Sequence, residues 1–123
     1  MSKEGNILIV EDSLITTIHL EKLVTNAGHH VLSKTDFAEQ VALICDDQMP
    51  DLILMDIMLN GEMTGVDAAE LLRQSTVNVP IIFISALSDH NTQTRIENIS
   101  KSTLIPKPFD QTQLISTINS FLN

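Results

Sequence analysis

The chain contains the run Leu52-Ile-Leu-Met-Asp56, in which four apolar residues lead directly into a carboxylate. Two runs of the same length, Ile7 to Val10 and Ile81 to Ile84, are rich in β-branched residues. Short, continuous apolar runs of this kind are typical of strands buried on both faces, as in the middle of a parallel sheet. The sequence therefore predicts three central strands.

Weaker apolar segments at Val31 to Ser33 and Thr103 to Pro106 fit edge strands, since Pro106 lacks the donor that a central strand requires. Helical spacing of apolar residues between the strands predicts four helices, each with one apolar stripe. The stripes are Ile15, Ile18, Leu23 and Ala27; Phe37, Val41 and Ile44; Ala68, Ala69 and Leu72; and Leu114, Ile118, Phe121 and Leu122.

Capping signals mark the ends of these helices. Gly28 is expected to end the first helix. A capping side chain with a partner three residues later predicts three helix starts, at Asp36 with Glu39, Thr64 with Asp67, and Asp110 with Gln113. The segment from Asp89 to Ser100 has only Ile96 and Ile99 as apolar anchors, so we expect a marginal, mobile helix there. Alternating strands and helices predict an α/β, doubly wound parallel sheet with helices on both faces.

Composition restricts the function. The 123 residues fit a single domain, residues 1–123, and because the chain ends at Asn123, soon after the last predicted helix, we expect no effector domain in it. A formal charge of −9 disfavours direct binding to nucleic acid or to anionic membranes. Without an apolar run long enough for a membrane span or a signal peptide, we expect a cytoplasmic protein. The single cysteine, Cys45, lies in an apolar stretch and is expected in the core.

Charged and hydroxyl-bearing residues follow the predicted strands. Glu11 and Asp12 come after the first strand, Asp56 after the third, Ser85 after the fourth, and Lys107, followed by Pro108, after the fifth. Ligands of such sheets bind beyond the carboxyl ends of the strands, so these side chains are expected to converge. Clustered carboxylates repel one another unless a cation neutralises them, and oxygen ligands suit Mg²⁺.

A carboxylate in such a site can act as a nucleophile toward a phosphoryl donor. Asp56 is the predicted nucleophile. Glu11 and Asp12 are expected to hold the metal, Lys107 to contact carboxylate or phosphoryl oxygens, and Ser85 to donate a hydrogen bond to the phosphoryl group.

With these residues placed, the chain resembles the receiver domain of two-component response regulators over essentially its whole length. The resemblance rests on four motifs in order: Ile7-Leu-Ile-Val-Glu11-Asp12-Ser13, Asp51-Leu-Ile-Leu-Met-Asp56-Ile57-Met58, Pro80-Ile-Ile-Phe-Ile-Ser85-Ala86 and Pro106-Lys107-Pro108-Phe109. It implies a flavodoxin-like, five-stranded sheet of strand order 2-1-3-4-5. It also implies that the domain is a phosphoacceptor that assists its own phosphorylation and dephosphorylation, rather than an enzyme.

The resemblance assigns roles to individual residues. Asp56 accepts the phosphoryl group, and Asp12, Asp56 and the main-chain carbonyl of Met58 surround Mg²⁺ or Mn²⁺, with Glu11 acting mainly through water. Ser85, Ala86 and Lys107 stabilise the phosphoryl group, and a cis peptide precedes Pro108. The implied partners are a sensor histidine kinase or phosphotransfer protein, a downstream effector, and, on phosphorylation, a second copy of the chain. Output is expected on the face formed by residues 89–100, Leu104 and residues 110–122.

Some positions depart from the common family pattern. Leu104 stands where many receivers carry an aromatic residue, which puts the usual aromatic switch in question. Asn60 replaces a frequent proline, and the loop from Asp56 to Gly65 is about one residue longer than the common form. Met58 and Leu87 flank the expected phosphoryl position, where they either restrict attacking water or simply fill space.

Three other functions share part of this residue pattern. A haloacid-dehalogenase-like phosphatase needs a second acid two positions after its nucleophile, where this chain has Met58. A flavodoxin-like cofactor binder needs hydroxyls and amides after the first strand, where Glu11 and Asp12 would repel a phosphate. A degenerate receiver that acts as a phosphorylation-independent interaction module is disfavoured because all the site positions are retained. The four histidines, His19, His29, His30 and His90, show no metal-binding spacing and are expected at the surface.

Overall fold

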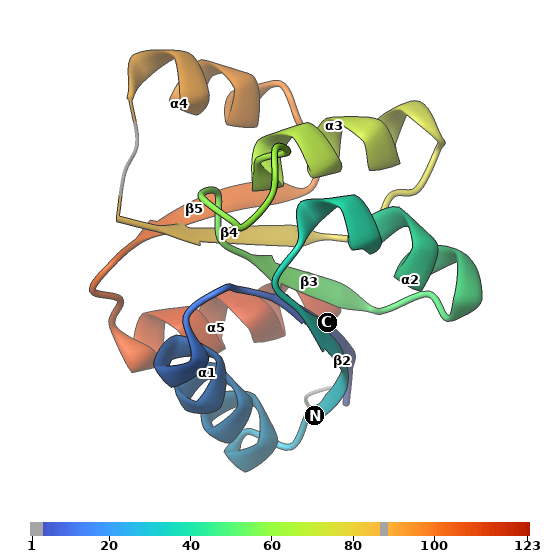
Figure 1. Ribbon diagram of the computed structural model, residues 1–123. Coiled ribbons are helices and arrows are strands. Elements are labelled where there is room, and N and C mark those ends of the chain that lie inside the picture. Colours follow the sequence, from blue (N-terminus) through green and yellow to red (C-terminus); the bar gives the residue numbers. More distant parts are fainter. Residues whose placement is uncertain (1–3, 87–88) are drawn as a thin grey trace.

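The structure, a computed structural model, describes residues 4–86 and 89–123 (Figure 1). Within them, five strands form one parallel sheet in the order β2-β1-β3-β4-β5. The strands are β1 (Asn6–Val10), β2 (His30–Thr35), β3 (Leu52–Met55), β4 (Ile81–Ser85) and β5 (Ser102–Pro106). The predicted class, strand order and edge positions of β2 and β5 are confirmed.

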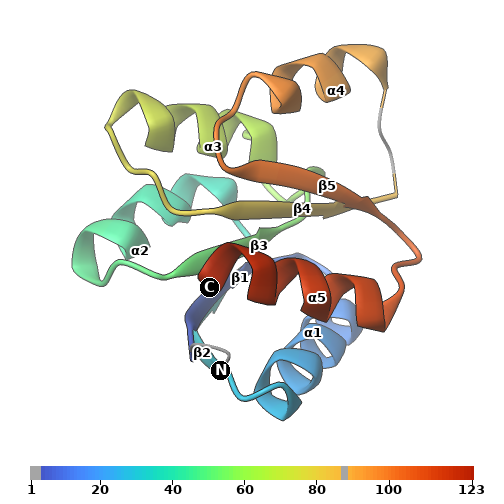
Figure 2. The same ribbon diagram turned by 180° about the vertical axis from the view of Figure 1, so that it is seen from behind.

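Helices cover both faces of this sheet. They are α1 (Leu14–Asn26), α2 (Val41–Asp47) after the short 3-10 helix η1 (Ala38–Gln40), α3 (Gly65–Gln74), α4 (His90–Glu97) and α5 (Gln111–Leu122). Figures 1 and 2 show α1 and α5 on one face and α2, α3 and α4 on the other. In the described part of the chain, no helix has the length and apolar character needed to cross a membrane.

Alternate residues of the central strands supply two apolar cores, one for each face. Leu8, Val10 and Phe83 belong to the core beneath α2, α3 and α4, whereas Ile9 and Ile82 belong to the core beneath α1 and α5. Strands covered on both faces need apolar residues at every position, which explains the continuous runs in the sequence. Cys45 lies in the first core with 3% of its surface exposed, as predicted.

The predicted apolar stripe of α1 is wrong at two positions. Ile15 and Ile18 are 82% and 45% exposed, and the helix instead buries Thr17, Leu20 and Val24. The Thr17 hydroxyl donates to the carbonyl oxygen of Ser13 at 2.9 Å, so a polar residue can occupy the buried face at little cost. The sequence pattern could not reveal this choice, because α1 carries apolar residues on both its buried and its exposed sides.

Two of the three predicted helix starts are correct. Thr64 and Asp67 form a reciprocal capping box at the start of α3, and Asp110 caps α5. The start predicted at Asp36 is wrong, because Phe37 is the N-cap of η1 and makes no capping side-chain hydrogen bond. Phe37 instead forms an isolated bridge with Asn60, so it lies outside the predicted helix. Gly28 follows the end of α1 with φ +93°, as expected of a helix-ending glycine.

The prediction that all four histidines lie at the surface is wrong for His29, which is 2% exposed. Its Nδ1 accepts a hydrogen bond from the Gly5 backbone at 3.1 Å, and its Nε2 pairs with Asn119 Oδ1 at 2.9 Å. Gly5 precedes β1 and Asn119 lies in α5, so the ring joins two distant segments. These partners satisfy a buried polar ring that the sequence alone had suggested was exposed.

Candidate functional site

The carboxyl ends of β1, β3, β4 and β5 bring the predicted site residues to one edge of the sheet, at the left of Figure 1. Backbone hydrogen bonds continue past the strand ends and fix the residues that follow. The Glu11 amide donates to Thr35, the Asp56 amide to Val10 and the Lys107 amide to Ser85, each at 2.9–3.0 Å. These hydrogen bonds hold the residues that follow the four strands at the same edge of the sheet.

Lys107 lies between two buried carboxylates. Its Nζ donates to Glu11 Oε2 at 3.0 Å and to Asp56 Oδ2 at 3.1 Å. The other oxygen of each carboxylate accepts a hydrogen bond from a backbone amide. Asp56 Oδ1 accepts from the Ile57 amide at 2.7 Å, and Glu11 Oε1 accepts from the Ser13 amide at 3.1 Å. These four hydrogen bonds fix the orientation of both acids, with Asp56 only 8% exposed.

Asp12 completes an acidic cluster on the solvent side of the site. One carboxylate oxygen from each of Glu11, Asp12 and Asp56 lies within 4.8 Å of the others. Carboxylate oxygens are the hard ligands that Mg²⁺ binds, and an exposed member leaves room for the waters that this ion retains. The residues present therefore fit a divalent cation.

Charge within the cluster is only partly balanced, because one ammonium faces three carboxylates. Burial raises the pKa of Glu11, the nearby charge of Asp56 raises it further, and the hydrogen bond from Lys107 opposes both effects. Burial lowers the pKa of Lys107, but its hydrogen bonds to Glu11 and Asp56 outweigh this and raise it overall. The lysine thus stays charged, and the excess negative charge favours a further cation.

The other predicted positions surround this cluster. Ser85 is buried at the end of β4, whereas Ala86 and Met58 are exposed. The peptide bond between Lys107 and Pro108 is cis, as predicted. Leu104 pairs with Phe83 across β4 and β5 and packs against the core beneath α4. Leu87 lies outside the described residues, and the role of the Met58 carbonyl stays a prediction.

Sequence reasoning missed Gly65, the first residue of α3. A Cβ on Gly65 would stand 2.1 Å from the backbone oxygen of Asp56, and the Gly65 amide donates to the Ile57 oxygen at 2.8 Å. Only glycine allows the helix to begin this close to Asp56, the residue that follows β3. Its place directly after a capping threonine was the available signal.

Sequence reasoning also missed the apolar surface beside the site. Leu14 and Ile15 at the start of α1 are 73% and 82% exposed. Two small hollows flank them, one of about 300 Å³ reaching Glu11 and Asp12, the other of about 220 Å³ reaching Lys107 and Phe109. Exposed apolar side chains next to charged groups are typical of surfaces that contact other proteins.

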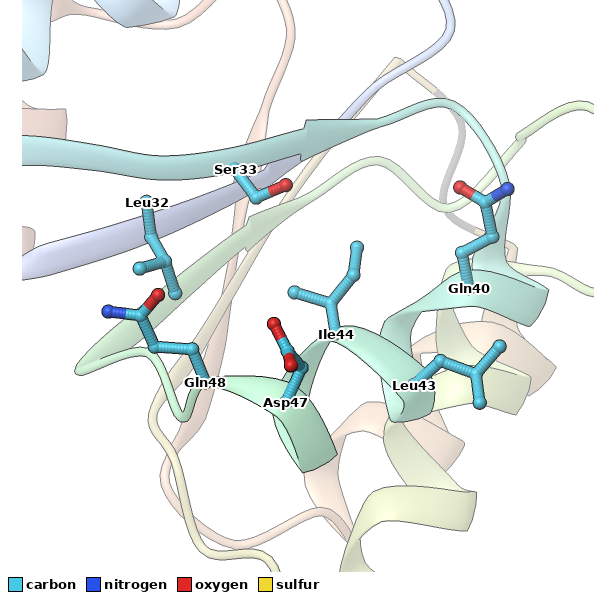
Figure 3. Close-up of a pocket in the computed structure, with 7 residues that line it drawn as sticks. All are labelled: Leu32, Ser33, Gln40, Leu43, Ile44, Asp47 and Gln48. Carbon is cyan, nitrogen blue, oxygen red and sulfur yellow. The ribbon is translucent and has the colours of Figure 1, made fainter.

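A further hollow of about 350 Å³ lies between β2 and α2 (Figure 3). Leu32 and Ser33 of β2 face the helix side, where Ile44 and Asp47 extend toward them. Its described lining includes a single carboxylate and no cationic side chain. It lacks the converging charges of the strand-end cluster, which is the better candidate for chemistry.

Fold and site define a flavodoxin-like α/β protein whose strand ends carry an acidic cluster bridged by a lysine. The model of the response regulator receiver domain family matches residues 7–119, and the chain belongs to this family. The structure also resembles the receiver domain of a modulated diguanylate cyclase from Desulfovibrio desulfuricans G20. That resemblance has a TM-score of 0.87 and 30% identity, and covers 98% of this chain and 94% of that one.

Curated relatives include regulators of greater length. The chain is 33% identical over 120 residues to the uncharacterized transcriptional regulatory protein YbdJ of Bacillus subtilis, covering 98% of this chain and 52% of YbdJ. It is 34% identical over 117 residues to the phyllosphere-induced regulator PhyR of Methylorubrum extorquens, covering 94% of this chain and 43% of PhyR. The chain thus spans about half the length of the curated relatives it matches.

Proposed function

We propose that this receiver domain accepts a phosphoryl group on Asp56 from a phosphohistidine of a sensor kinase or phosphotransfer protein. The observation that carries the proposal is the position of Lys107, whose ammonium contacts Asp56 and Glu11 at once. Such a cation holds the carboxylate in place and stays beside it when more negative charge arrives. If Glu11 and Asp56 served only to stabilise the fold, the exposed carboxylate of Asp12 beside them would have no role.

In the transfer, a carboxylate oxygen of Asp56 forms a bond to phosphorus while the bond from phosphorus to the donor's imidazole nitrogen breaks. The electron pair of that bond stays on the imidazole, which becomes neutral or takes a proton from solvent. Lys107 balances charge on the phosphoryl oxygens, and the Ser85 hydroxyl and Ala86 backbone donate hydrogen bonds to them. These roles require no change in the strands that hold the residues.

A bound Mg²⁺ would neutralise charge on the transferring oxygens, and Asp12, Asp56 and the Met58 carbonyl are the groups we expect to hold it. Glu11 is engaged by Ser13 and Lys107, which fits an indirect role through water. Removal of the cation should therefore suppress transfer without unfolding the domain.

Exposed Leu14, Ile15 and Ile18 beside the site offer an apolar surface for the protein that donates the phosphoryl group. Output to an effector, or to a second copy of the chain, is proposed on the face formed by α4, β5 and α5. We expect this exchange to take place in the cytoplasm, and the domain to serve as a phosphoacceptor rather than an enzyme with a released product.

Intact mass after incubation with acetyl phosphate tests the proposal. The native chain should gain one phosphoryl group in the presence of Mg²⁺ and almost none after chelation. Asp56→Asn should gain none, because the amide is a poor nucleophile. Asp51→Asn is the matched control, since Asp51 lies at the opposite end of the same strand and should leave the adduct unchanged.

An adduct that persists in Asp56→Asn would place the reaction elsewhere. Absence of an adduct from the native chain, under conditions that phosphorylate another receiver domain, would overturn the proposal and favour a phosphorylation-independent interaction module.

A further inference from the structure

α4 has little apolar contact with the rest of the protein. Ile96 is the buried apolar side chain of this helix, and Ile99 follows just after it. Ser102 adds hydrogen bonds to the carbonyl oxygens of Ile96 and Ile99 at 3.2 and 2.8 Å, which hold the end of the helix. So few buried contacts leave the position of α4 sensitive to any additional polar tie.

Arg95 supplies that tie. Its Nε donates to Glu70 Oε2 at 3.0 Å and its Nη2 to Glu70 Oε1 at 2.6 Å, a two-point contact with one carboxylate. The same Nη2 also donates to Asp67 Oδ1 at 2.8 Å. We call Arg95, Glu70 and Asp67 the α3–α4 clamp. Figures 1 and 2 both show these two helices side by side above the sheet.

The clamp is connected to the strand that carries the phosphoacceptor. The second oxygen of Asp67 accepts from the Thr64 amide at 2.9 Å, as part of the capping box of α3. Gly65, next in the chain, contacts the backbone of Asp56 so closely that no Cβ fits between them. The start of α3 is thereby fixed relative to Asp56, and Arg95 attaches α4 to this fixed point.

We propose that the α3–α4 clamp positions α4 in the arrangement described here, in which both oxygens of Asp56 are hydrogen-bonded, and that phosphorylation must act against the clamp to move this helix. The regulatory part rests on the proposed phosphorylation of Asp56. Arg95 is a positioning residue, since it acts through Asp67 and Gly65 and contacts none of the reacting groups.

The two-point contact with Glu70 explains why position 95 requires arginine. A guanidinium presents parallel donors that match a carboxylate in two places, whereas an ammonium makes a single point contact. The three side chains are each about 40% exposed, so water and salt weaken the clamp without abolishing it. A tie of this strength can be broken by a modification near Asp56.

Hydrogen exchange on the full chain tests the clamp before any phosphorylation. Amides of α4 should exchange about fivefold faster in Arg95→Gln, the effect of losing a partly exposed multi-point ion pair. Lys22→Gln is the matched control, because it removes one positive charge from α1 on the other face of the sheet. This control should leave α4 exchange unchanged. In a protein that already carries Glu70→Gln, adding Arg95→Gln should accelerate α4 exchange less than it does in the native protein.

Phosphorylation by acetyl phosphate provides the second part of the experiment, with the adduct measured by mass in the same samples. In the native chain the adduct should accelerate α4 exchange, and in Arg95→Gln the additional acceleration should be clearly smaller. If the native chain forms the adduct but α4 in unphosphorylated Arg95→Gln exchanges at the native rate, the clamp is overturned and the proposed function stands. If α4 exchanges faster in Arg95→Gln but no variant forms an adduct, the proposed function and the regulatory role are both overturned. The clamp would then stand only as a contact that positions α4.

Discussion

His29 joins three parts of the chain through one side chain. The Gly5 amide donates to Nδ1, so the ring proton resides on Nε2, where it is donated to Asn119 Oδ1. His29 itself follows the end of α1, while its partners precede β1 and lie in α5. At 2% exposure, neither ring nitrogen has ready access to water as a substitute partner.

We expect His29→Ala to lower the free energy of unfolding by about 1–3 kcal/mol, the cost of leaving buried polar groups unpaired. Urea denaturation followed by circular dichroism measures this. His30→Ala is the matched control, since the adjacent His30 is 65% exposed and its Nε2 lies 3.5 Å from Glu4 Oε2 at the surface. It should change stability by less than about 0.5 kcal/mol. Equal losses in both variants would refute a specific role for His29.

Gly65→Ala should destabilise the protein by roughly 1–3 kcal/mol, because the new methyl group meets the Asp56 backbone oxygen and must displace it. The same shift should slow phosphorylation of Asp56, measured as adduct formed over time. Gly28→Ala separates the two effects. A Cβ on Gly28 has no atom within 4 Å, so this variant loses some stability from its positive φ but should keep the native phosphorylation rate. Native kinetics in Gly65→Ala would show that the close approach is unimportant.

At the scale of elements, Asp67 anchors the start of α3 through both of its carboxylate oxygens. One of its oxygens completes the capping box with Thr64, and the other accepts from Arg95 of α4. The capping box could be predicted from a threonine followed by an acid three residues later. The contact with Arg95 could not, because the two residues are 28 positions apart and the sequence holds no signal that pairs them.

The hydrogen bond from the Thr64 backbone, followed by that from Arg95, holds the pKa of Asp67 below its usual value. A carboxyl group whose pKa is lower in the folded state stabilises the fold at pH values above its unfolded pKa, and this stability is lost as the pH falls through the folded pKa. Asp67→Asn should therefore cost roughly 0.3–1 kcal/mol at pH 7, and less as the pH falls below about 4.

Urea denaturation of native and Asp67→Asn proteins at pH 7 and pH 3 measures this difference. Asp46→Asn, at an exposed position of α2, serves as the control for charge removal alone and should show little effect at pH 7. A penalty for Asp67→Asn that stays constant with pH would contradict the assigned cause.

The apolar pattern of the sequence predicts the buried residues of the central strands but not those of α1. The central strands were predictable because burial on both faces leaves only apolar residues, as in Leu52 to Met55. α1 was not, because its exposed side carries Ile15 and Ile18, whose apolar character fits a contact surface better than a core. An apolar stripe on a helix therefore need not be the face that packs on the domain's own sheet.

For the whole molecule, parallel strands explain why the site could be predicted without a structure. Every strand ends at the same edge, so residues as distant as Glu11 and Lys107 must converge once the sheet order is right. What the sequence left open was the closeness of packing, seen in Gly65, and the polar ties between distant segments, seen in His29 and Arg95. These depend on contacts for which no local pattern exists.

The central claim, that Asp56 is the phosphoacceptor, is tested most directly by trapping the acyl phosphate chemically. Borohydride reduces an aspartyl phosphate to homoserine, which peptide mass spectrometry can locate in the chain. After treatment with acetyl phosphate and Mg²⁺, homoserine should appear at position 56 and be absent from the chelated sample. Homoserine at Asp12 or at any other carboxylate, or none in a sample whose intact mass shows the adduct, would contradict the account.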